Sequence, residues 1–175
     1  LLTLQNHTQL TRYENGWDHN PYNAANGGPL SSPAEFFTNP AVRELFRHKL
    51  RYIVARWGYS PHIFGWDLWS EVDLTMGYQP AQVRAWHQEM ARYLKGLDPH
   101  HLVSTHFCYH SRTGQIMDLP EMDFAHSNAW VNVDGLPDSQ VAAIRRFYED
   151  MKPLGKPSFV SEYGGHYVAN PPEIL

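Results

Sequence analysis

The sequence predicts an α/β fold in which a parallel sheet is covered on its outside by helices. Segments with strand character alternate with helical segments along the chain, and most of the strand segments are uninterrupted apolar runs. The length of 175 residues suits one domain. The hydrophobic fraction of 42% is large enough for a core, which excludes disorder over most of the chain.

The expected strands are five short apolar segments. Residues 1–5 form the first, and residues 62–69 form a dense apolar run that suits a strand buried on both faces. The other three expected strands are residues 101–106, 122–127 and 157–161. Tyr163 and the two glycines after it are expected to turn the chain out of the last strand.

Three long helices are expected between these strands. Asn39 followed by Pro40 is a helix start, because asparagine is a good N-cap and proline suits the first helical position, and Gly58 ends that helix. The other two long helices are expected at residues 80–97 and 137–154. Residues 111–121 are polar and can form at most a stunted helix.

The composition excludes several classes of protein. The formal net charge is −4 and the sequence has no basic stripe, which argues against nucleic-acid binding. No apolar run approaches the roughly 18 residues of a membrane span. The single cysteine, Cys108, excludes an intrachain disulfide framework and a zinc site built on a cysteine pair. The chain starts without an initiator methionine or a charged signal-peptide start.

Polar side chains gather where the expected strands end, and in parallel α/β folds this edge of the sheet carries the function. Two of them are carboxylates, Glu71 and Glu162, each at the end of an apolar strand. Such a residue can simply pair with an arginine or cap the next helix. Two together suit the cleavage of a glycosidic bond, in which one protonates the leaving oxygen and the other attacks the anomeric carbon or activates water.

Four segments carry a resemblance to a known family. The sequence WDLWSE at 66–71 resembles the fourth-strand signature of the retaining glycoside hydrolases of clan A, particularly family five, and FVSEYG at 159–164 resembles their seventh-strand nucleophile motif. Likewise, LQNH at 4–7 resembles the end of their third strand, and DFAH at 123–126 that of their sixth. The resemblance implies an incomplete TIM-type (β/α) barrel of about five β/α units, strands three to seven, in one catalytic domain over residues 1–175.

The resemblance also implies a mechanism and a substrate class. Glu71 would be the acid/base and Glu162 the nucleophile of a double displacement on a β-linked glucan or mannan, with no cofactor. Their carboxyl groups are expected about 5–5.5 Å apart. Family members are often secreted. The alternative is a catalytically weak or inactive carbohydrate-binding fragment, because Ser70 stands where the family usually has asparagine and nothing matches strands one, two and eight.

Further residues are expected to contact the sugar. They are His7, Trp17, Tyr22, Ser70, His106, His126, Asn128, Trp130 and Tyr163. The long irregular segment of residues 6–39 is expected to fold over the C-terminal face and to present Trp17 or Tyr22 for stacking, the alternative being core packing. No helical metal-ligand spacing accompanies the histidines, so no metal site is expected.

The incomplete barrel also predicts self-association. The first and last strands would both be bare edges, whose unpaired N–H and C=O groups are sticky. A homo-oligomer across the open edge, most simply a two-fold dimer, is therefore expected.

Overall fold

The computed structural model describes residues 1–11, 16–131 and 139–165. Its strands are β1 (Leu2–Thr3), β2 (Gly65–Asp67), β3 (Leu102–Ser104), β4 (His106–Phe107), β5 (Ala125–Val131) and β6 (Ser158–Gly165). Every pairing between them is parallel, and the neighbours follow chain order, β1-β2-β3 and β4-β5-β6. Strands in chain order, with crossovers between them, are the arrangement of a (β/α) barrel rather than of a doubly wound sheet.

The two groups of strands are continuous with each other. β3 and β4 are two halves of one strand separated by Thr105, and backbone hydrogen bonds along β2 and its extension reach both halves. The amide of Leu68 donates to Ser104 (2.9 Å), and the amide of His106 donates to Trp69 (2.8 Å). The chain therefore forms an incomplete barrel in which, among the described residues, β1 and β6 are the edges.

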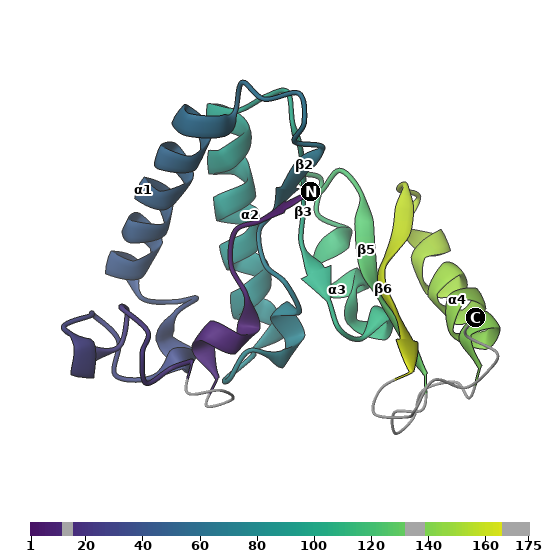
Figure 1. Cartoon of the computed structure of the whole chain (residues 1–175), viewed down its shortest axis with the longest axis horizontal. Coiled ribbons are helices and arrows are strands. Elements are labelled where there is room, and N and C mark those ends of the chain that lie inside the picture. Colours follow the sequence, from purple (N-terminus) through teal and green to yellow (C-terminus); the bar gives the residue numbers. More distant parts are fainter. Residues whose placement is uncertain (12–15, 132–138, 166–175) are drawn as a thin grey trace.

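The helices confirm the sequence prediction closely. They are α1 (Pro40–Trp57), α2 (Pro80–Leu97), the short α3 (Gly114–Met117) and α4 (Gln140–Met151), which a 3-10 turn extends through Lys152–Leu154. The Asn39 side chain caps α1 by accepting from the amides of Ala41 and Val42. Figure 1 shows α1 beside α2 on one side of the strands and α4 at the opposite end, next to β6.

Two expectations about irregular segments need correction. Tyr163 does not turn the chain out of the last strand, because β6 continues to Gly165. The segment 6–39 contributes to the core instead of only covering a face. Its side chains Leu10, Leu30, Phe36 and Phe37 are buried, and Phe36 packs edge-on against Trp69.

Candidate active site

Glu71 lies at the carboxyl end of β2, and β6 carries Glu162. The β1 side supplies His7, because the chain beyond β1 stays beside the chain beyond β2. Asn6 bridges Ser70 in parallel register, and the amide of His7 donates to the Ser70 carbonyl at 3.2 Å. The parallel strands thus bring three polar side chains from separate parts of the sequence to one edge.

The backbone of Glu71 is in the left-handed region, with φ 50° and ψ 52°. Among the described residues it is the only non-glycine with a positive φ. Such a conformation costs roughly 1–2 kcal/mol and is typical of functional positions. Although Glu71 precedes the 3-10 turn of Val72–Leu74, its side chain makes no capping hydrogen bond there. The helix-capping explanation for this carboxylate is therefore wrong.

The Glu71 carboxylate is 17% exposed and has three close partners. Asn128 Nδ2 donates to its Oε1 at 2.7 Å, His7 Nδ1 lies 3.3 Å from its Oε2, and the Cys108 thiol also hydrogen-bonds to it. Burial raises the pKa of Glu71, and the charge of Glu162 raises it further. Burial lowers the pKa of His7, which favours a neutral imidazole beside the carboxyl group. A carboxyl group with a raised pKa suits a proton donor.

Glu162 lies on an exposed part of β6 at an irregularity in the strand pairing. Ser127 pairs with Val160, whereas Ala129 pairs with Tyr163, so β6 has one extra residue in this interval. Bulges of this kind re-aim side chains and are common beside active sites.

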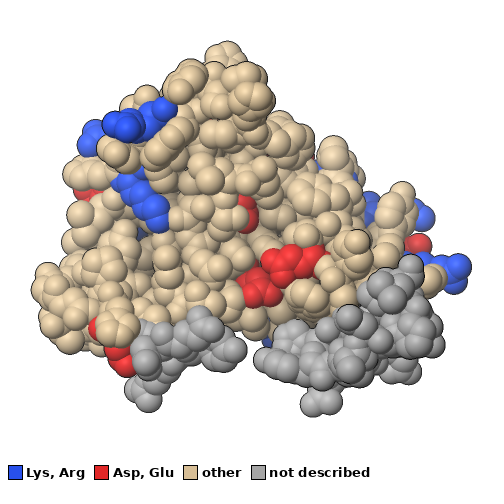
Figure 2. All heavy atoms as spheres, in the orientation of Figure 1, with Lys and Arg blue, Asp and Glu red and all other residues tan. Residues whose placement is uncertain are grey.

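The surroundings of Glu71 and Glu162 also argue against the alternative that each carboxylate is present only to pair with an arginine. In the described part of the chain, no lysine or arginine forms an ion pair with Glu71 or Glu162. Figure 2 shows the largest acidic area at the centre of one face, with the lysine and arginine side chains toward its borders. Two acidic groups close enough to interact, without a compensating cation, raise the cost of ionising both.

Two histidines lie under the site on neighbouring strands. His106 and His126 stack with ring centroids 5.2 Å apart. His126 Nδ1 lies 2.9 Å from Ser161 Oγ, and its Nε2 lies 3.7 Å from Asp67. His106 connects to Glu71 instead through Asn128, because its Nε2 lies 2.6 Å from Asn128 Oδ1, and its Nδ1 lies 3.4 Å from Ser70 Oγ.

Two aromatic residues follow the carboxylates on β5 and β6. Trp130 pairs with Gly164 in the strand register, and a side-chain carbon at Gly164 would lie 3.4 Å from the Trp130 ring. Tyr163, directly after Glu162, is 64% exposed. Both residues therefore lie close to Glu162 in the paired strands, and contact with a sugar stays a prediction for them.

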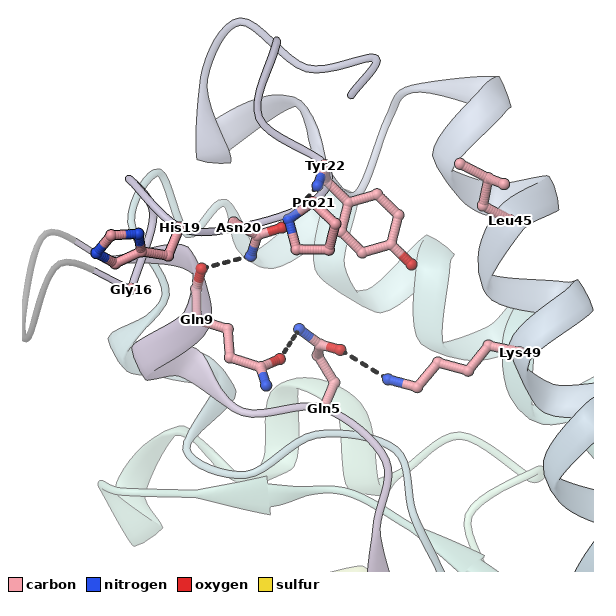
Figure 3. Close-up of a pocket in the computed structure, with 9 residues that line it drawn as sticks. All are labelled: Gln5, Gln9, Gly16, His19, Asn20, Pro21, Tyr22, Leu45 and Lys49. Atoms are coloured by element: carbon pink, nitrogen blue, oxygen red, sulfur yellow. Dashed lines mark hydrogen bonds between the residues drawn. The ribbon is translucent and has the colours of Figure 1, made fainter. Parts of the chain in front are cut away.

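Trp17 and Tyr22 lie elsewhere. Trp17 is only 8% exposed and belongs to the main core. Tyr22 packs edge-on against Phe36 and lines a cavity of about 570 Å³ between the segment after β1 and α1, together with Gln5 and Lys49 (Figure 3). Among the described residues, no hydrogen bond or ring contact joins Trp17 or Tyr22 to Glu71 or Glu162. Their placement favours the core-packing alternative over sugar stacking.

Sequence reasoning missed the role of Cys108 and Asp73. From the sequence, Cys108 served only to exclude a disulfide framework and a cysteine-pair zinc site, whereas its thiol contacts Glu71. The buried Asp73 carboxylate accepts the backbone amides of Cys108 (2.8 Å) and Tyr109 (3.1 Å), which fixes this loop beside Glu71. A signal was present, because Cys108 follows His106 by two residues and alternate residues of a strand share a face.

The described residues contain neither a cluster of metal ligands nor a helix that could span a membrane. Residues 1–11, 16–131 and 139–165 contain no group of three or more histidine, cysteine or acidic side chains that could hold a metal ion. None of the helices within these ranges is long and apolar enough to cross a membrane.

The fold is that of part of a (β/α) barrel, with two interacting carboxylates carried on different strands. Solved structures with this fold include the endo-1,4-beta-D-mannanase of Thermotoga petrophila RKU-1, with a TM-score of 0.71 and 18% identity over 98% of this chain and 56% of that one. The endo-1,4-beta-mannanase of Rhizomucor miehei gives a TM-score of 0.67 and 23% identity over 93% of this chain and 53% of that one.

Sequence relatives carry related names. The chain is 26% identical to "Probable mannan endo-1,4-beta-mannosidase F" of Aspergillus flavus over 87% of this chain and 37% of that protein. It is 27% identical to "Mannan endo-1,4-beta-mannosidase F" of Aspergillus clavatus over 87% of this chain and 39% of that protein. The chain thus spans less than half the length of these relatives. No protein-family model matches it. The similarity confirms the predicted resemblance to clan A glycoside hydrolases.

Proposed function

We propose that residues 1–175 form a catalytic part of a retaining glycoside hydrolase that cleaves β-linked mannan. Glu162 attacks the anomeric carbon and forms a covalent glycosyl-enzyme, while Glu71 donates its proton to the leaving oxygen. Glu71 then takes a proton from the water that releases the sugar. The observation that carries the proposal is that the strands bring Glu71, held by Asn128 and His7, close enough to Glu162 on β6 for the charge of Glu162 to raise the pKa of Glu71.

The substrate class rests on the relatives. Mannanases are named both among the sequence relatives and among the structures with the same fold, which favours mannan over the glucan that the sequence alone left open. Trp130 and Tyr163 are the rings placed to stack on a sugar. The separation of about 5–5.5 Å between the carboxyl groups stays a prediction.

The test uses soluble β-1,4-mannan and a soluble β-glucan with the whole chain. We expect hydrolysis of mannan, with the β-anomer as the first product in proton NMR, and no turnover by Glu162→Gln. Glu162→Gln should also lower the pKa of Glu71, because it removes a neighbouring negative charge. First release of the α-anomer would contradict a retaining mechanism.

The second candidate, a carbohydrate-binding fragment without competent catalysis, is favoured by Ser70 and by the share of the relatives that the chain spans. Affinity electrophoresis in mannan separates the two. Retarded migration of the wild-type chain without any product would support the fragment.

Self-association across β1 and β6 stays a prediction. Light scattering of the chain at low micromolar concentration tests it, and a monomer would contradict it.

A further inference from the structure

A chain of hydrogen bonds runs from Ser70 to Glu71, although the two residues are adjacent in the sequence. Ser70 Oγ lies 3.4 Å from His106 Nδ1, His106 Nε2 lies 2.6 Å from Asn128 Oδ1, and Asn128 Nδ2 donates to Glu71 Oε1 at 2.7 Å. This series of hydrogen bonds runs from Ser70, beyond the end of β2, to His106 on β4, then to Asn128 on β5, and back to Glu71 beyond β2.

The chemistry of each group fixes the direction of these bonds. The structure turns the Asn128 NH2 group toward Glu71 and its carbonyl toward His106, which is the orientation that Glu71 requires in its ionised state, when it only accepts. His106 must then carry a proton on Nε2. Its Nδ1 is left to accept from the Ser70 hydroxyl in the neutral ring. Burial lowers the pKa of His106, as does the stacked His126, and both effects favour that neutral form.

Both central side chains are closed off from solvent. Asn128 is fully buried and His106 is 4% exposed. Both polar ends of the Asn128 amide are already used by His106 and Glu71, which leaves no free amide group pointing to a sugar. Tyr163 differs from Asn128 and His106 in this respect, because its side chain is exposed and a sugar could reach it.

We propose that Asn128 is a positioning residue for the acid/base Glu71, and that His106 fixes which end of the Asn128 amide faces it. This inference rests on the proposed function and changes the expected role of both residues from sugar contact to support of the proton donor. Without His106, the amide could rotate and turn its carbonyl oxygen toward the carboxylate, which would repel it. Because the Glu71 side chain makes no capping hydrogen bond to the turn that follows it, its position depends on its other partners, of which Asn128 is one.

The kinetic test compares aryl β-mannosides whose leaving groups need acid assistance to different degrees. Asn128→Leu should lower kcat/KM about 10- to 100-fold for a phenyl leaving group and less than about 3-fold for a dinitrophenyl one, because only the former depends on the placed proton. His106→Leu should behave similarly, and His106→Gln should restore most of the loss, since glutamine can donate to the Asn128 carbonyl.

Ser127→Ala is the matched control. Ser127 neighbours Asn128 on β5 and makes a buried hydrogen bond to the Phe107 carbonyl at 2.6 Å, without a contact to Glu71. Ser127→Ala should change kcat/KM for both substrates by the same small factor. Equal losses for both leaving groups in Asn128→Leu would overturn the proposal, because a merely structural defect acts on both. If Asn128→Leu does not fold, the isosteric Asn128→Asp takes its place and should show the same selective loss.

A second readout does not need activity. Carbon NMR of the Glu71 carboxyl should show a higher pKa in Asn128→Leu than in wild type, because the variant removes a donor that favours the carboxylate. Glu162, Asp73, His7 and Cys108 also face Glu71 and are present in both proteins. If the wild type cleaves no mannoside, the proposed function fails while this titration still decides the role of Asn128. An unchanged pKa of Glu71 in Asn128→Leu would overturn the positioning role of Asn128.

Discussion

The two ends of the strand array are packed very differently. Under α1 and α2, five aromatic rings contact one another, with centroids 4.8 to 6.2 Å apart: Phe36, Phe37, Phe46, Trp69 and Trp86. Near α4, a separate small cluster contains only Ala129, Val131 and Ala143, although Phe147 and Met151 reach the main core. Glu71 therefore projects from the densely packed region and Glu162 from the lightly packed one.

This difference matches the two roles of the proposed function. A proton donor needs a partly desolvated position that raises its pKa, and burial raises the pKa of Glu71. A nucleophile must be reachable, and Glu162 is an exposed residue of β6. Under the proposed function, the packing around each carboxylate, rather than its residue type, would separate the acid from the nucleophile.

The largest expected effect comes from breaking the aromatic cluster. Trp86→Ala removes a fully buried ring that contacts four of its aromatic neighbours, and should lower the free energy of unfolding by about 3–5 kcal/mol. Urea unfolding followed by circular dichroism measures it. A loss below about 1 kcal/mol would show that the region relaxes around the cavity, against the expectation of dense packing.

A smaller, pH-dependent effect is expected at the edge of the same region. Burial lowers the pKa of Lys49 from 10.5 to about 8, and its ammonium group donates to Gln5 Oε1 at 3.0 Å (Figure 3). Between these values the unfolded chain binds more protons than the folded one, so stability rises with pH. The stabilisation is complete above pH 10.5, the pKa of Lys49 in the unfolded chain, and is lost as the pH falls through about 8, its pKa in the folded protein.

Lys49→Met should therefore remove a stability rise of up to about 3 kcal/mol between about pH 8 and pH 10.5. Urea unfolding across this range measures the slope, and the exposed Lys152→Met is the control that should keep the rise. An identical slope in Lys49→Met and wild type would contradict the burial of this charge.

The smallest effect is expected on the outer face of α4. Ile144 is 43% exposed, so Ile144→Ala should change the free energy of unfolding by less than about 1 kcal/mol. The same urea experiment measures it. A loss as large as that of Trp86→Ala would remove the distinction between the two regions.

Helices and strand order were predictable because their signals are local. The Asn39–Pro40 start and the apolar spacing set α1 and α2 at their observed bounds, and alternation with apolar runs gave the parallel strands in chain order. The end of β6 was predicted wrongly because glycines read as a turn, whereas pairing with β5 carries the strand to Gly165. Tertiary pairing overrode the local turn preference.

The site was predictable only in part. Glu71 follows the end of its strand, whereas Glu162 lies inside β6, and His7 and Asn128 contact Glu71 while His106 stacks on His126 and bonds to Asn128. The hydrogen-bond order through His106 and Asn128 depends on the lateral register of neighbouring strands, which no local pattern encodes. For the same reason, the contribution of Trp17 to the core could not be separated from an exposed role.

The left-handed backbone at Glu71 has a consequence for sequence drift. Glycine would adopt φ 50° without strain, so the glutamate at this position carries a backbone cost of roughly 1 kcal/mol that only its side chain can justify. Under the proposed function, selection for stability and selection for chemistry therefore act in opposite directions on one residue.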